Sequence, residues 1–171
     1  MSLESSTGLG VLSSYGPRSV EGKFGGETAD EVVKHVVFDI SYEDLSSTSA
    51  ATYSGLDYVF PTGSIFLRCE YIVDTAVVGP TAITAGTYTF NTSTKAVTAH
   101  DADGLMTAVV GVVTALDAIG DRVAGTGALL TTGTGAGYAM TAPVVVRILP
   151  TVAAATAGKL RVYISYLCPQ P

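Results

Sequence analysis

Apolar and polar residues alternate along four stretches of this chain, and this two-residue period restricts the fold more than any other feature. The stretches lie within 33–42, 65–74, 138–148 and 160–168. Alternation of this kind is typical of a β-strand with one buried face. The in-phase apolar residues are Val36, Phe38, Ile40 and Tyr42, then Ile65, Leu67, Cys69, Tyr71 and Val73, then Tyr138, Met140, Ala142, Val144, Val146 and Ile148, and last Val162, Ile164, Tyr166 and Cys168.

Turn-forming residues separate these stretches from shorter apolar runs. Pro61-Thr62-Gly63-Ser64 is a strong turn pattern, and weaker strands are expected at 56–60, 82–90 and 96–99. Pro143 lies in the opposite phase to its apolar neighbours, which favours an edge position or a break there. About eight short strands with regular turns predict an all-β fold, either a β-sandwich or a jelly roll.

One segment follows a helical period instead. Its apolar residues recur at steps of three and four, with Asp103 placed as N-cap and Gly120 as C-cap. Its valines weaken the prediction, because β-branched residues lose rotamer freedom in a helix. We predict one short helix over 105–119, with Leu105, Val109, Val112, Val113, Leu116 and Ile119 on its apolar side.

Residues 1–30 differ from the rest because they are rich in Ser and Gly and their few apolar residues follow no period. Such a segment cannot build a core of its own. We predict an extended N-terminal arm over 1–30 and a β-sandwich domain over 31–171. One interpretation of the arm is plain disorder. The other is an arm that becomes ordered on a partner, with Tyr15, Arg18 and Phe24 as the partner-binding residues.

Charge is scarce in this sequence. Only 14% of the residues are charged, against roughly 25% in an ordinary soluble domain, while 47% are hydrophobic. Two explanations are open. The chain is either a secreted β-protein with a Thr/Ser surface or a subunit whose outside is covered by neighbours. The second explanation predicts a homo-oligomer, since symmetric closure hides uncharged surface.

Two classes of partner are not expected. Nine basic and 15 acidic residues give a net charge of −6, and no run of Lys or Arg is present, so a nucleic-acid-binding surface is not expected. The longest apolar stretch, 105–116, is too short to cross a bilayer. The first 14 residues also lack the pattern of a secretory signal.

Residues for catalysis or metal binding are few. The chain has only two histidines, and His35 lies in an apolar alternating stretch. His100 precedes Asp101-Ala102-Asp103-Gly104, which is similar to the start of a calcium loop, but the later ligands are missing. No Gly-x-Ser-x-Gly motif occurs. We predict that the protein is not an enzyme and has no cofactor and no metal site.

The two cysteines match no metal or redox spacing. Cys69 and Cys168 lie 99 positions apart (168 − 69) and both fall on the apolar phase of an expected strand. Buried free cysteine behaves as a small hydrophobic residue. We expect two buried free thiols, with a disulfide as the alternative.

Four segments together resemble small virion proteins of tailed bacteriophages. They are Tyr15-Gly16-Pro17-Arg18-Ser19-Val20-Glu21-Gly22-Lys23-Phe24-Gly25-Gly26, Phe60-Pro61-Thr62-Gly63-Ser64-Ile65, Asp101-Ala102-Asp103-Gly104-Leu105, and Thr156-Ala157-Gly158-Lys159-Leu160-Arg161-Val162-Tyr163-Ile164-Ser165-Tyr166. The resemblance covers most of the chain as a pattern of strands and turns, and none of these segments is diagnostic alone.

The resemblance implies an auxiliary protein that decorates or cements the capsid exterior. It further implies the major capsid protein as partner, a homotrimer, and no catalytic residues. A phage head-fibre, tail or receptor-binding protein explains the sandwich equally well. A secreted carbohydrate-binding module comes third, because such modules usually display aromatic platforms and this chain has no Trp.

Overall fold

The structure, a computed structural model, describes residues 28–30, 33–48, 58–91, 94, 96–107, 115–130 and 138–168. Nine strands lie in these ranges, and all of their pairings are antiparallel. They are β1 (Thr28–Asp30), β2 (Val33–Ser41), β3 (Val59–Phe60), β4 (Ile65–Val78), β5 (Ala82–Phe90), β6 (Val97–Met106), β7 (Arg122–Ala124), β8 (Val144–Thr151) and β9 (Ala157–Leu167).

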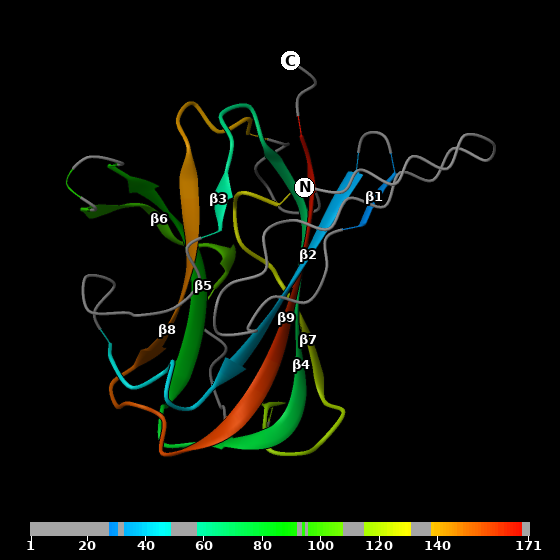
Figure 1. Cartoon of the computed structure of the whole chain (residues 1–171). Coiled ribbons are helices and arrows are strands. Elements are labelled where there is room, and N and C mark those ends of the chain that lie inside the picture. The colour runs from blue at the N-terminus through cyan, green and yellow to red at the C-terminus, as the bar shows by residue number, and fades with distance from the viewer. Residues whose placement is uncertain are drawn as a thin grey trace, which may run out of the picture.

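The strands form two sheets that face each other (Figure 1). One has the order β1-β2-β9-β4-β7, and the other has the order β3-β8-β5-β6. The pairs β2·β9, β3·β8, β4·β7 and β5·β6 are nested around the connection between β5 and β6. A long hairpin rolled in this way is a jelly roll, so the predicted all-β sandwich is confirmed. β1 adds a short strand to the outer edge of β2.

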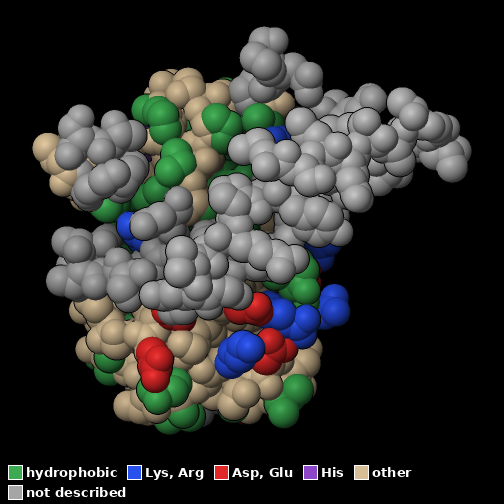
Figure 2. Space-filling model, viewed as in Figure 1, with side chains coloured by type: hydrophobic (Ala, Val, Ile, Leu, Met, Phe, Trp, Pro, Cys, Tyr) green, Lys and Arg blue, Asp and Glu red, His purple; other side chains and the backbone are tan. Residues whose placement is uncertain are grey.

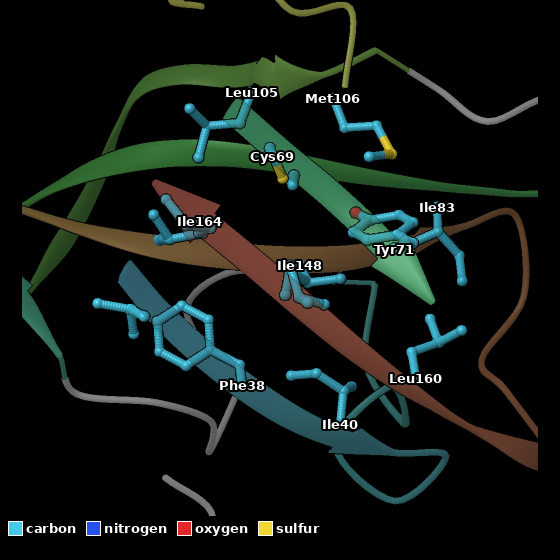
Figure 3. Close-up of a cluster of buried hydrophobic side chains, with 14 of the residues drawn as sticks. Phe38, Ile40, Cys69, Tyr71, Ile83, Leu105, Met106, Ile148, Leu160 and Ile164 are labelled. Atoms are coloured by element: carbon cyan, nitrogen blue, oxygen red, sulfur yellow. The ribbon is translucent and has the colours of Figure 1, made fainter. Parts of the chain in front are cut away.

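The core lies between the two sheets, where side chains from both point toward one another (Figure 3). In this view Phe38 and Ile40 of β2 lie on one side of the core and Cys69 and Tyr71 of β4 on the other, with Ile148 of the opposite sheet drawn between them. The predicted alternation is confirmed in β2 and in β9, whose inward residues are buried. These residues are Val36, Phe38 and Ile40 in β2 and Leu160, Val162, Ile164 and Tyr166 in β9.

Strand β4 departs from the predicted alternation at its start. Its register against β9 shifts between Phe66 and Arg68, which marks a β-bulge. A bulge inserts one residue and reverses the phase of the side chains before it. Phe66 is therefore buried, whereas Ile65 and Leu67, which were expected inside, are only half-buried. Tyr42, expected at the end of the first buried face, lies beyond β2 and is exposed.

The stretch 138–148 forms a shorter strand than the alternation predicted. β8 begins at Val144, directly after Pro143, which confirms the predicted break. Tyr138, expected on the buried face, is exposed. β8 lies between β3 and β5, and all its residues except the last are buried. Alternation could not predict this, because a strand buried on both faces has no polar phase.

The predicted helix at 105–119 is wrong at both ends. Asp103, expected as the N-cap, and Leu105 both belong to β6. Ala115 is helical, the residues from Leu116 to Gly120 form bends and a turn, and 108–114 lie outside the described residues. Leu105 and Leu116 are fully buried in the core of the sandwich.

The segment after β7 joins the two sheets along one side. The Gly125 N–H donates to the Cys69 carbonyl in β4, and the Leu129 N–H donates to the Gly104 carbonyl in β6. Gly127 packs against backbone, because an added Cβ would lie 2.1 Å from the Gly104 oxygen. A residue larger than glycine therefore does not fit at position 127 without a shift of the backbone.

Candidate partner-binding surfaces

The outer face of the five-stranded sheet carries charged side chains from four strands. We call it the charged face and define it as Asp39, Arg68, Glu70, Asp74, Arg122, Lys159 and Arg161, which alternate with the buried residues of β2, β4, β7 and β9. In Figure 2, most of the visible Lys and Arg side chains lie at the lower right of the molecule, with Asp and Glu side chains among them. The outward-facing residues of the predicted strands therefore lie on one side of one sheet.

Arg161 is the centre of this face. Its Nε and Nη2 atoms donate to Asp74 Oδ1 at 2.9 and 2.7 Å, and its Nη1 lies 3.5 Å from the Tyr163 hydroxyl. The hydrogen bonds and the charge of Asp74 raise the pKa of Arg161 further above its ordinary value. Beside this group, Arg68 Nη2 donates to Glu70 Oε2 at 2.9 Å. The ion pairs hold these four side chains in place.

Two cations on the charged face remain without an acidic partner. Arg122 and Lys159 are exposed, and neither makes an ion pair or side-chain hydrogen bond within the described part of the chain. The face has four cations and three carboxylates, a surplus of one positive charge, in a chain whose net charge is −6. A partner surface that satisfies Arg122 and Lys159 must therefore be acidic.

The outer surface of the other sheet carries an acidic bulge, which we define as residues 101–104 of β6. The register between β5 and β6 shifts on both sides of the pair Thr87–Asp101. The bulge rests on Gly86, where an added Cβ would lie 2.3 Å from the Asp101 and Ala102 carbonyl oxygens. Gly86 shares its face with Tyr88, which belongs to a small apolar cluster separate from the core. The bulge therefore lies on the side opposite the charged face.

Burial and the neighbouring Asp103 act on Asp101 of the acidic bulge. Burial raises the pKa of Asp101, and a hydrogen bond to the Asp103 side chain and the Asp103 charge raise it further. A hydrogen bond with the Asp103 backbone and the charge of His100 lower the pKa of Asp101. A Lys or Arg from a partner would favour the ionised form of Asp101.

Neither histidine takes part in an arrangement for catalysis. His35 Nδ1 lies 2.8 Å from Ser165 Oγ on the exposed sheet surface, and His100 Nδ1 lies 3.0 Å from Thr87 Oγ1. In the described ranges, no group of three His, Cys, Asp or Glu residues is placed to hold a metal ion. No helix in those ranges is long and apolar enough to cross a membrane.

The end of the sandwich at the bottom of Figure 1, where β4 and β8 finish, carries two exposed valines, and we call it the apolar end. Val78 closes β4, and Val152 follows β8 in the loop that leads to β9. Val152 is 84% exposed and has a φ of 72°. This left-handed conformation is unfavourable for a β-branched residue. The strain at Val152 has no compensating burial of its own side chain.

The predicted partner-binding residues Tyr15, Arg18 and Phe24 lie outside the described residues, as does the rest of 1–27. The charged face was missed as a site, although the outward phase of the stretch 65–74 already contained Arg68, Glu70 and Asp74. The pairing of Asp74 with Arg161 could not be predicted, because it depends on β4 and β9 being neighbours across 87 positions. The alternation of apolar and polar residues does not reveal which strands are neighbours in a sheet.

Comparisons with known proteins give little further information. A scan against models of protein families finds no match, and a search of curated proteins finds no significant match. Among solved structures, the fold is similar to a chain described as "Capsid of Ralstonia phage GP4", with 18% identity and a TM-score of 0.49. The similar region covers 81% of this chain and 86% of that chain. A likeness of this extent carries no argument about function.

Proposed function

We propose that this chain is a virion structural protein that decorates and cements the outside of a tailed-phage capsid, with the major capsid protein as its partner. The observation that carries the proposal is the charged face, an exposed sheet surface on which two ion pairs leave Arg122 and Lys159 without an acidic partner in the described ranges. A surface of this kind suits binding to another protein. Jelly rolls serve viral capsids and lectins alike, so the fold permits this role without fixing it.

The four resembling segments add support, and so does the charge of the chain. A net charge of −6 suits a position on the exterior, away from packaged nucleic acid. The function requires no cofactor and no catalytic residue. The N-terminal arm, with Tyr15, Arg18 and Phe24, supplies a second contact to the shell in this proposal.

Co-sedimentation with capsids tests the proposal. Purified protein is mixed with phage capsids that lack it. The number of bound copies per capsid is then measured at increasing protein concentration. Saturation at a fixed number of copies per shell supports decoration. Binding that never saturates, or no binding at all, would contradict it.

A head-fibre, tail or receptor-binding role is the second candidate. The observation that favours it is the apolar end with Val78 and Val152, because loops at one end of a sandwich are a common place for binding sites. That role predicts binding to host cells or purified cell-surface glycan in the absence of capsids. A glycan array and whole-cell pull-down distinguish it from decoration.

A further inference from the structure

The charged face and the acidic bulge are complementary in charge and lie on opposite sides of the same molecule. The charged face presents Arg122 and Lys159 without acidic partners. The acidic bulge presents Asp103 as an exposed side chain and Asp101 as a half-buried one, and neither makes an ion pair within the described ranges. Arg147 pairs with Gly86 below the bulge, but its side chain is buried, so a partner that approaches from outside meets the two carboxyl groups.

We propose that copies of this chain associate head to tail, with the charged face of one copy on the acidic bulge of the next. Arg122 and Lys159 then face Asp101 and Asp103 of the neighbouring copy. A contact between two different surfaces is heterologous, so it closes into a ring where the rotation between copies allows and otherwise continues as an open chain. This contact concerns the isolated protein and does not rest on capsid binding. Because the proposed function places the same charged face on the shell, a copy that binds the shell through this face must first leave its neighbour.

The two surfaces differ in shape. The charged face is the outer side of the sheet in which β9 and β4 pair over most of their lengths. The acidic bulge is stacked on Gly86, outside its own sheet. An element raised above one sheet can therefore meet the open outer side of the other sheet in a neighbouring copy.

The charges also disfavour the competing symmetric contacts. Two charged faces brought together would join two surfaces that each carry a surplus of positive charge, and two acidic bulges would oppose four carboxylates. Like charges placed opposite each other across an interface suppress wrong pairings. The head-to-tail arrangement is the one in which both sets of unpaired charges are matched.

Sedimentation velocity on the full chain tests this proposal. At high micromolar concentration and low salt, the weight-average mass should exceed the monomer mass of 17.5 kDa, and it should fall toward that value as salt screens the contact. The variant R122E/K159E and the variant D101K/D103K should each associate at least about tenfold more weakly, because each places like charges in contact.

A mixture of the two variants gives the decisive result. Equimolar R122E/K159E and D101K/D103K should regain association, since every contact between unlike variants again joins opposite charges. The control E43K/D117K changes the charge by the same amount as D101K/D103K at two exposed positions away from the bulge, and should associate at least as strongly as wild type. Circular dichroism and thermal unfolding confirm that each variant is folded.

Three results would overturn the proposal. They are a wild-type protein that stays monomeric at low salt, single-surface variants that associate like wild type, and a mixture that remains monomeric. Either a ring or an open chain supports it, and the mass of the largest species distinguishes the two. Capsid co-sedimentation is a separate measurement, so failure here leaves the proposed function standing.

Discussion

Val152 combines an exposed side chain with a backbone conformation that valine disfavours. The φ of 72° places it in the left-handed region, and no other non-glycine residue of the described ranges has a positive φ. For an L-residue this region costs roughly 1–2 kcal/mol. Because the Val152 side chain is almost fully exposed, that cost is not repaid by burial.

Replacing Val152 with glycine should therefore stabilise the protein. We expect V152G to raise the free energy of unfolding by about 1 kcal/mol, or the melting temperature by about 2–4 °C for a domain of this size. The control is V78G, an exposed valine within β4, where glycine should lower stability. Calorimetry measures both, and an equal loss in the two variants would show that Val152 is not strained.

Cys69 lies in the core, and its thiol is neutral there. Burial raises the pKa of Cys69 from 9.0 to about 12, with a smaller contribution from the charge of Glu70. Cys168 was also expected to be buried, but it is only half-buried, and no disulfide joins the two cysteines. A thiol reagent should therefore modify Cys168 slowly in the native protein and reach Cys69 only after denaturation. Modification of two thiols at equal rates in native buffer would contradict this.

The raised pKa of Cys69 predicts a dependence of stability on alkaline pH. The unfolded chain ionises this thiol near pH 9, whereas the folded chain keeps it neutral up to about pH 12. The neutral Cys69 thiol therefore makes its full contribution to the free energy of unfolding below pH 9. That contribution falls as the pH rises, by at most about 1.4 kcal/mol per pH unit. Urea unfolding from pH 8 to 10.5 should show a steeper loss for wild type than for C69A. Parallel curves would contradict the assignment.

At the scale of elements, the sequence predicted those strands that have one buried and one exposed face. β2 and β9 satisfy this condition, so their alternation is visible in the sequence. The bulge in β4 reverses the phase of its side chains, and β8 is buried on both faces, so neither strand shows a simple two-residue period. The helix prediction failed at its ends because Leu105 belongs to β6 and Leu116 lies in a bend, and the core of the sandwich buries both. The alternation of apolar and polar residues reflects which face of a strand is buried. Burial depends on neighbours that are distant in sequence, so it cannot be predicted from one segment alone.

Two glycines near the joined side of the sandwich allow a steric cost to be compared with the cost of an unfavourable backbone conformation. G127A should destabilise the protein by more than about 2 kcal/mol, because its Cβ would meet the Gly104 backbone at 2.1 Å. G120A has open space around its Cβ but a φ of 90°, so it should cost about 1 kcal/mol. Urea unfolding measures both. Equal costs would mean that the close approach of β6 to the segment after β7 relaxes easily.

At the scale of the whole molecule, β1 divides the predicted arm into two parts. Residues 1–30 were predicted as one extended arm, and the last three, Thr28–Asp30, pair with the first three residues of β2. Those three residues belong to the sheet edge, whereas Tyr15, Arg18 and Phe24 precede it. This position gives the arm a fixed point of departure from the domain.

Two truncations use this division to test the proposed role of the arm. Deleting residues 1–27 removes Tyr15, Arg18 and Phe24 but keeps β1, so the domain should stay folded while capsid binding weakens severely. Deleting residues 1–30 also uncovers the edge of β2, so it should lose some stability without weakening binding further. An extended segment of 27 residues reaches at most roughly 100 Å, enough to pass its own domain and touch a neighbouring subunit. Ordering it costs about 1–2 kcal/mol per residue, which requires anchors such as the two aromatic rings. Full occupancy of capsids by the protein lacking 1–27, at wild-type affinity, would show that attachment depends on the folded domain alone.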